Sequence, residues 1–260
     1  MNRRFLLGTT SVVAATAGLL WWQRNPITRA ALSSETFDDV RLTESPDGVC
    51  ALTPEQIEGP FFISAPERSD IREDRSGLPL ELTLAVSRGA DCQPVAGAIV
   101  EIWHCDAAGR YSGYDETLAR RPFDTLRYLG GPEARKAPEN GKTYLRGAQR
   151  TGDSGEVHFT TILPGWYEPR VTHIHVKVLV GNTEQLTTQL YFPTSLTAEV
   201  YAEHPSYAPY GASPYHHGND AVLGNQPAAE GLLLNPTRLS TELSTRRGGG
   251  LRASGRMHII

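Results

Sequence analysis

The stretch THIHVKVLV, residues 172–180, indicates the fold class, because its side chains alternate between two chemical types. One face of an extended chain through this stretch carries four apolar side chains, Ile174, Val176, Val178 and Val180. The other face carries His173, His175 and Lys177. A period of two residues indicates a β-strand with one face against a core, and β-branched residues favour that conformation.

Short segments of the same kind occur on both sides of this strand. They are LPLELTLAV at 78–86, AIVEIWH at 98–104, EVHFTTIL at 156–163 and QLTTQLYF at 185–192. No segment shows a sustained helical period, although residues 195–204 could form a short helix. The 25 glycines and 18 prolines suit many turns. The pattern predicts an all-β fold, a β-sandwich with long loops that cover a metal site and short helices at most.

Composition divides the chain into four parts. We expect a signal or anchor over residues 1–30, a linker or arm over 31–49, a sandwich domain over 50–236 and a disordered tail over 237–260. The tail is rich in glycine and arginine, which is typical of segments that bury too little apolar surface to fold. The formal net charge of −4 argues against a nucleic-acid partner, since there is no basic surplus to offset phosphates.

The N-terminal segment combines paired arginines with an apolar run. Arg3 and Arg4 precede FLLGTTSVVAATAGLL, residues 5–20. This layout is typical of a signal peptide, and the two arginines indicate the twin-arginine route. We therefore expect an exported protein, periplasmic or extracellular. The alternative is an uncleaved anchor that contacts a membrane, because the run is near the lower length limit for a spanning helix.

The chain contains three cysteines, Cys50, Cys92 and Cys105. In an oxidising compartment, one disulfide and one thiol are the expected arrangement. Cys50 and Cys92 lie beside turn residues, whereas Cys105 lies at the end of an apolar strand. We predict a Cys50–Cys92 disulfide with Cys105 buried and reduced; the alternative is three free thiols.

A metal site is one interpretation of His173 and His175, since two imidazoles at i and i+2 on a strand can bind one ion. The alternative is a histidine pair on a solvated face. Tyr167 follows a Pro-Gly turn just upstream, and Tyr111 follows the turn at Gly109. Phenolate is a hard anionic ligand that suits Fe(III) better than zinc, whereas either tyrosine could instead be a packing residue.

Three motifs, taken in order, resemble the intradiol ring-cleavage dioxygenases, which are non-haem Fe(III) enzymes that open catechols between the two hydroxyls. They are G-R-Y after the W-H strand, then P-G-W-Y, then R-x-x-H-I-H. The resemblance is strongest to the beta-type chain of protocatechuate dioxygenase and its exported single-chain relatives. It covers roughly residues 50–192.

This resemblance implies a non-haem Fe(III) cofactor with four ligands, Tyr111, Tyr167, His173 and His175. It also implies that Arg170 lies beside the substrate ring and that Gln189 lies behind the ligands. Enzymes of this family insert both atoms of O₂ into a catechol to give a muconate-type diacid, and Tyr167 matches the ligand that substrate displaces and that then acts as a base. The partners would be a small catechol and O₂. A homodimer is compatible with the way relatives assemble through an N-terminal arm.

The identity of the catechol stays open. Only two residues separate Tyr167 from Arg170, fewer than in the protocatechuate enzymes, which should reshape the rim of the pocket. The long segment 112–145 is either a functional cover or a solvated loop. Three arginines within it could receive a substrate carboxylate or could face solvent: Arg120, Arg121 and Arg127.

Other histidines are weaker candidates. His104 and Asp106 form a rival i, i+2 pair, although we expect His104 to pack or hydrogen-bond beside the site. His216 and His217 are expected on the surface, and His158 is expected to be exposed.

Two other function classes stay open. A β-sandwich of this lineage could bind aromatic or carbohydrate ligands without turnover, and a different His-x-His metalloenzyme could use zinc or copper. All four ligand positions hold the residue types of the family pattern, which favours the dioxygenase.

Overall fold

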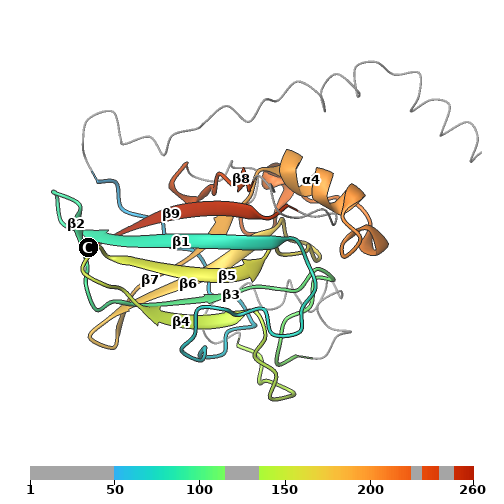
Figure 1. The fold of residues 1–260 in the computed structure, drawn as a ribbon. Helices are drawn as coiled ribbons and strands as arrows, with labels where there is room; N and C mark the ends of the chain where they lie inside the picture. The colour runs from blue at the N-terminus through green and yellow to red at the C-terminus, as the bar shows by residue number, and fades with distance from the viewer. Residues whose placement is uncertain (1–49, 115–134, 224–229, 240–248) are drawn as a thin grey trace, which may run out of the picture. The chain divides into compact units, whose positions relative to one another are not determined.

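The computed structural model describes residues 50–114, 135–223, 230–239 and 249–260, and over these residues nine strands form two sheets (Figure 1). The first sheet holds β2 (Gln93–Pro94), β1 (Pro79–Arg88), β9 (Leu251–Ile259) and β8 (Thr237–Arg238) in this order, with β5 (Glu156–Ile162) also paired to β1. The second sheet is antiparallel and runs β4 (Arg146–Arg150), β3 (Ile99–Trp103), β6 (His173–Val180) and β7 (Thr183–Tyr191). The prediction of an all-β fold is confirmed.

Helical structure is limited to short elements in the described part of the chain. The α-helix α4 (Thr194–Glu203) lies close to the expected segment 195–204. Three single 3₁₀ turns follow it, η3 (Ala208–Tyr210), η4 (His217–Asn219) and η5 (Glu230–Leu232). None of the described helices has the length and apolar character needed to cross a membrane.

The apolar faces of both sheets meet in one core. Leu80, Leu82 and Leu84 of β1 are fully buried there, together with Val176 and Val178 of β6. Burying a Val or Leu side chain contributes about 1.5–3 kcal/mol, so the alternation of these strands supplies a large part of the driving force for folding. The same alternation directs His173, His175 and Lys177 to the opposite face of the second sheet.

The C-terminal strand β9 corrects one expectation. It runs parallel to β1 over its whole length, with Leu80 opposite Leu251 and Arg88 opposite Ile259. The prediction of disorder over 237–260 is therefore wrong for β8 and β9. Every second residue from Leu251 to Ile259 is buried, but alanine and glycine occupy two of those positions. Because these two side chains are small, the apolar period of two residues is hard to recognise in the sequence, and the segment resembles a disordered tail rich in glycine and arginine.

The face that carries the histidines is covered by the chain segment before β1. The amide of Gln56 donates to the carbonyl of Thr187 on β7 at 2.8 Å, and Gln189 Nε2 donates to the carbonyl of Ile57 at 2.9 Å. Lys177 is only 3% exposed. The alternative of histidines on a solvated face is therefore wrong, because residues 50–62 replace the solvent.

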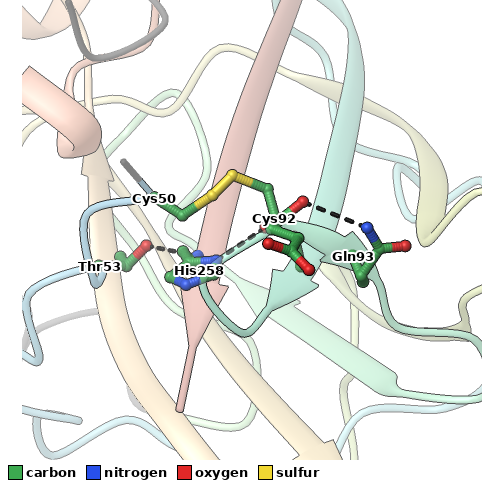
Figure 2. The surroundings of a disulfide bond; sticks show 7 residues. Cys50, Thr53, Cys92, Gln93 and His258 are labelled. Atoms are coloured by element: carbon green, nitrogen blue, oxygen red, sulfur yellow. Dashed lines mark hydrogen bonds between the residues drawn. A yellow bond between two sulfur atoms is a disulfide. The ribbon is translucent and has the colours of Figure 1, made fainter. Parts of the chain in front are cut away.

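A disulfide holds the start of this covering segment (Figure 2). Cys50 is bonded to Cys92 in the turn after β1, with their Cα atoms 5.7 Å apart. Beside it, the amide of Thr53 donates to the carbonyl of His258 on β9 at 3.0 Å, and the amide of His258 donates to Thr53 Oγ1 at 2.8 Å. Cys105 is a buried free thiol. The predicted arrangement of the three cysteines is confirmed.

Several expectations concern residues outside the described part of the chain. They are the signal or anchor at 1–30, the arm at 31–49 and the arginines of the long loop, Arg120, Arg121 and Arg127.

Candidate metal centre

Tyr111 is delivered by a compact loop that follows β3. The carboxylate of Asp106 organises this loop, since its Oδ1 accepts the amides of Ala108 at 2.9 Å and Arg110 at 3.0 Å. The amide of Asp106 in turn donates to the carbonyl of Arg110 at 2.9 Å. These bonds close the loop on itself and fix the direction in which the Tyr111 side chain leaves it.

The Tyr111 loop packs directly on the loop that carries Tyr167. Gly109 has a φ of +77°, and a Cβ atom at this position would lie 2.2 Å from the carbonyl oxygen of Trp166. Only glycine combines this backbone conformation with so close an approach. The glycine in the G-R-Y motif therefore brings the two tyrosines together.

Tyr167 and Arg170 are joined by a tight turn. The amide of Arg170 donates to the carbonyl of Tyr167 at 2.7 Å. The chain then enters β6, where His173 and His175 follow on one face. The short spacing noted in the sequence thus places three kinds of polar side chain at one end of the second sheet.

Four side-chain atoms from these segments converge. The Oη atoms of Tyr111 and Tyr167 are 3.3 Å apart, and they lie 3.3 Å and 3.2 Å from His173 Nε2. The Nε2 atoms of His173 and His175 are 3.1 Å apart. All four residues are at most 3% exposed. The convergence expected from the sequence is present in the structure.

Aromatic rings hold two of these side chains in place. Trp103 of β3 stacks on His175 with ring centroids 4.8 Å apart and planes 6° apart. Phe61 of the covering segment stacks on Tyr111 at 4.7 Å. Each ring restricts its neighbour to one orientation toward the shared centre.

Burial keeps the two phenols and the two imidazoles neutral as long as no metal ion is bound. It raises the pKa of Tyr167 to about 12, against the opposing charge of Arg170, and it raises the pKa of Tyr111 well above the usual value, helped by Tyr167. Burial and then the charge of Arg170 lower the pKa of His173 to about 3. Burial and then His173 lower the pKa of His175 well below its usual range. The site therefore offers lone pairs on nitrogen and phenols that only a strong positive charge would ionise.

The tautomer of His173 is set by the backbone. Its Nδ1 lies 2.6 Å from the carbonyl oxygen of Val171, which can only accept, so Nδ1 carries the proton. The lone pair of Nε2 then faces the shared centre, as in histidines that ligate metals through one nitrogen and donate through the other.

Comparison with known proteins identifies the family. The family model described as Dioxygenase matches residues 57–200, more than half of the chain. The chain belongs to the intradiol ring-cleavage dioxygenase family. Catechol 1,2-dioxygenase 1 of Acinetobacter lwoffii is 30% identical over 181 residues, which cover 60% of this chain and 51% of that protein. Catechol 1,2-dioxygenase 2 of the same organism is 31% identical, over 62% of this chain and 59% of that protein. The chain thus spans about half the length of these curated relatives.

The match to one solved structure covers more of both chains than the matches to these curated relatives do. The intradiol ring-cleavage dioxygenase of Tetranychus urticae is 28% identical, with a TM-score of 0.67, and the match covers 81% of this chain and 95% of that one.

The structure of this dioxygenase-family chain places at the site a polar residue, Asp220, that the sequence did not reveal. Asp220 is 1% exposed, and its Oδ2 accepts Arg170 Nε at 2.8 Å and the amide of Val171 at 2.7 Å. It lies three residues after His217 in a segment read as surface, with no periodic pattern to mark it. Gln189, which the sequence did indicate, accepts from Arg170 Nη2 through its Oε1.

The rival histidines of this dioxygenase-family chain are engaged elsewhere. Both nitrogens of His104 are paired, Nδ1 with the carbonyl of Cys105 at 2.8 Å and Nε2 with Thr161 Oγ1 at 2.7 Å. His158 and His216 are exposed, as expected. His217 is half-buried, and its Nε2 bonds the carbonyl of Phe192 at 3.0 Å, so its placement on the surface is only partly right.

The donor set fits a metal ion. Ligand atoms about 2.1 Å from one ion, at angles of about 90–110°, lie roughly 3.0–3.4 Å from one another. Here His173 Nε2 lies 3.1–3.3 Å from the other three donor atoms, and the two phenol oxygens are 3.3 Å apart. Among the described residues, no group of three or more His, Cys, Asp or Glu side chains could hold a metal ion. A metal at this point therefore depends on the two phenols, and hard phenolate oxygens suit a trivalent ion.

Proposed function

We propose that this chain is a non-haem Fe(III) enzyme that cleaves a catechol between its two hydroxyl-bearing carbons, with both atoms of O₂ entering a muconate-type diacid. The observation that carries the proposal is that His173 Nε2 lies 3.1–3.3 Å from three other donor atoms, namely the phenol oxygens of Tyr111 and Tyr167 and Nε2 of His175. Tyr111, Tyr167, His173 and His175 would hold the ion. When bound, Fe(III) supplies Lewis acidity that ionises phenols and draws a catechol into chelation.

Tyr167 is the residue that would move a proton. A catechol loses protons when it binds as a chelating anion, and a phenolate oxygen at the site can accept one of them. The pKa of Tyr167 is raised to about 12 mainly by burial, so its oxygen is a strong base once ionised. Tyr111 is held by the self-bonded loop around Asp106 and by the stacked ring of Phe61. This difference supports Tyr167 as the exchangeable ligand and Tyr111 as the permanent one.

Arg170 would stabilise negative charge that develops on the substrate. Its guanidinium is buried. Its positive charge lowers the pKa of the Tyr167 phenol, against the effect of burial, so the charge acts at the centre where the catechol would bind. Fixed charges in a site closed to water stabilise developing charge strongly. Gln189 and Asp220 hold the guanidinium in one orientation.

Oxygen uptake with product analysis tests this function. The iron-loaded full chain is supplied with catechol, chlorocatechols, hydroxyquinol and carboxylated catechols under isotopically labelled O₂. We expect uptake with at least one of them and a ring-opened diacid that carries two labelled atoms. A protein that binds catechols and consumes no oxygen would support the non-catalytic binding module instead. A protein that retains only zinc or copper would support the other metalloenzyme.

We also propose that the protein is exported. The Cys50–Cys92 disulfide supports this location, because disulfides persist mainly in oxidising compartments. The Arg3-Arg4 pair before an apolar run is the second support. Fractionation of cells that express the full chain tests it, and a protein found entirely in the cytosol with Cys50 reduced would contradict it.

A further inference from the structure

Asp220 is a buried carboxylate whose two oxygens are both saturated. Its Oδ2 accepts from Arg170 Nε and from the amide of Val171, at 2.8 Å and 2.7 Å. Its Oδ1 accepts the amides of Val222 and Leu223, each at 2.9 Å. The loop after η4 is therefore folded around this carboxylate, and the carboxylate is fixed against the turn that leads to the histidines.

Arg170 has no other charged partner among the described residues. Its side chain is 3% exposed, and that of Asp220 is fully buried. The remaining acceptors for Arg170 are neutral, namely Gln189 Oε1 and, at 3.4 Å, Tyr191 Oη. An opposite charge at hydrogen-bond distance inside a protein offsets part of the field that a lone cation would produce. A catechol ring bound beside Arg170 would therefore experience the combined field of Arg170 and Asp220.

Asp220 also acts on the ligand side of the turn. The peptide of Val171 donates to Asp220 through its amide, and the carbonyl of Val171 accepts the proton of His173 Nδ1. One carboxylate therefore orients both the arginine and the peptide that sets the tautomer of a histidine at the centre. The loop is held further by the amide of Ala221, which donates to the carbonyl of Pro169 at 3.2 Å.

We propose that Asp220 is a positioning residue that sets substrate preference: by offsetting part of the charge of Arg170, it makes the site favour catechols with uncharged ring substituents over catechols that carry a carboxylate. This inference rests on the proposed function, since it needs a catechol bound beside Arg170. Burying a carboxylate without a cation to offset it is costly. Removing the negative charge of Asp220 leaves Arg170 free to supply that offset.

Two ligands of the same shape separate charge from size: 3,4-dihydroxybenzoate and 3,4-dihydroxybenzamide. The iron-loaded full chain is titrated with each in the absence of oxygen, and the dissociation constants are read from the visible spectrum. We expect the unmodified protein to bind the amide more tightly, by about tenfold, which corresponds to ~1.4 kcal/mol. Asp220→Asn should lose or reverse this preference. Equal binding by the unmodified protein, or tighter binding of the benzoate, would overturn the inference without any variant.

A double variant separates charge from structure. Arg170→Gln combined with Asp220→Asn removes both charges and keeps an amide pair, so the ratio of the two dissociation constants should return close to that of the unmodified protein. A ratio that stays where Asp220→Asn put it would mean that the loop, not the charge, sets the preference. Asp70→Asn is the matched control, because Asp70 pairs with Arg72 on the surface, and its ratio should not change. If neither ligand binds the unmodified protein, this inference fails, whereas the proposed function fails only if oxygen uptake is absent with every catechol of the panel.

Discussion

Trp103 lies flat against His175, with ring centroids 4.8 Å apart and planes 6° apart. The two residues are direct neighbours across β3 and β6. His175 Nδ1 has no hydrogen-bond partner among the described residues. The ring of His175 therefore lacks the hydrogen bond at Nδ1 that orients the ring of His173. The indole face of Trp103 orients the His175 ring instead.

Replacing Trp103 by leucine should therefore weaken metal binding as well as stability. Loss of a buried tryptophan costs roughly 3–5 kcal/mol when it is truncated to alanine, and leucine should recover part of that. Without the flat surface, the His175 ring can rotate, and we expect iron content after dialysis against a chelator to fall. Trp103→Phe is the control, since it retains a ring to stack on and should keep more iron. Equal iron retention by the two variants would contradict the orienting role.

The two tyrosines should differ when each is replaced by phenylalanine. Tyr111→Phe removes the proposed ligand on the self-bonded loop and should strip or greatly weaken iron binding. Tyr167→Phe should retain iron and slow the loading of catechol, because it removes the proposed proton acceptor. Metal analysis and stopped-flow mixing with catechol measure these effects. Normal loading by Tyr167→Phe would remove the basis for its role as a base.

Gly109 should tolerate no side chain. Gly109 and Gly89 both have positive φ, +77° and +74°, but nothing lies within 4 Å of a Cβ at Gly89, whereas a Cβ at Gly109 would meet a carbonyl oxygen at 2.2 Å. Gly89→Ala should cost about 1–2 kcal/mol from backbone conformation alone. Gly109→Ala should cost about 1–3 kcal/mol more from the steric overlap, and should reduce iron content as the tyrosine loops separate. Equal unfolding free energies for the two variants would be inconsistent with this packing.

The disulfide should stabilise the segment that covers the histidines. Cys50 and Cys92 close a loop with a sequence separation of 42 residues, for which the chain-entropy model gives about 4 kcal/mol. We expect Cys92→Ser to lower the free energy of unfolding by about this amount and to speed hydrogen exchange in residues 50–62. The variant frees the thiol of Cys50, but burial raises the pKa of the Cys105 thiol, so Cys105 should not pair with it. Unchanged exchange in the covering segment would contradict this assignment.

His104 should make the protein less stable in acid. Burial lowers its pKa from 6.5 to about 4 in the folded state, so between these values only the unfolded state binds the proton. Stability is then fully present above pH ~6.5 and is lost as the pH falls toward 4, by on the order of 3 kcal/mol. His104→Gln keeps hydrogen-bonding capacity and does not titrate. The difference in the free energy of unfolding between this variant and the unmodified protein should therefore change between pH ~6.5 and pH ~4. A constant difference would refute the prediction.

The sequence predicted the centre better than its surroundings. The alternation in 172–180 placed His173 and His175 on one face, and the family motifs added Tyr111, Tyr167, Arg170 and Gln189. These features are local in sequence, so they can be read from spacing. The resemblance also supplied roles that alternation alone does not contain.

Non-local features could not be read in the same way. Asp220 is one acidic residue in a loop, and its partner Arg170 lies fifty residues earlier. The strand β9 depends on β1 for its pairing, and its small core residues hide its period. The cover over the histidines arises from a segment more than a hundred residues before β6. Each of these contacts is set by the tertiary fold, not by local pattern.

The visible absorption spectrum of the iron-loaded protein reports on all four side chains of the proposed metal centre. If phenolates of Tyr111 and Tyr167 share one Fe(III) with His173 and His175, the protein should be red-brown from tyrosinate charge transfer. The band should shift when catechol is added without oxygen, and Tyr167→Phe should weaken it. A colourless protein that carries stoichiometric iron, or a band that ignores catechol, would contradict a metal centre built from these four side chains.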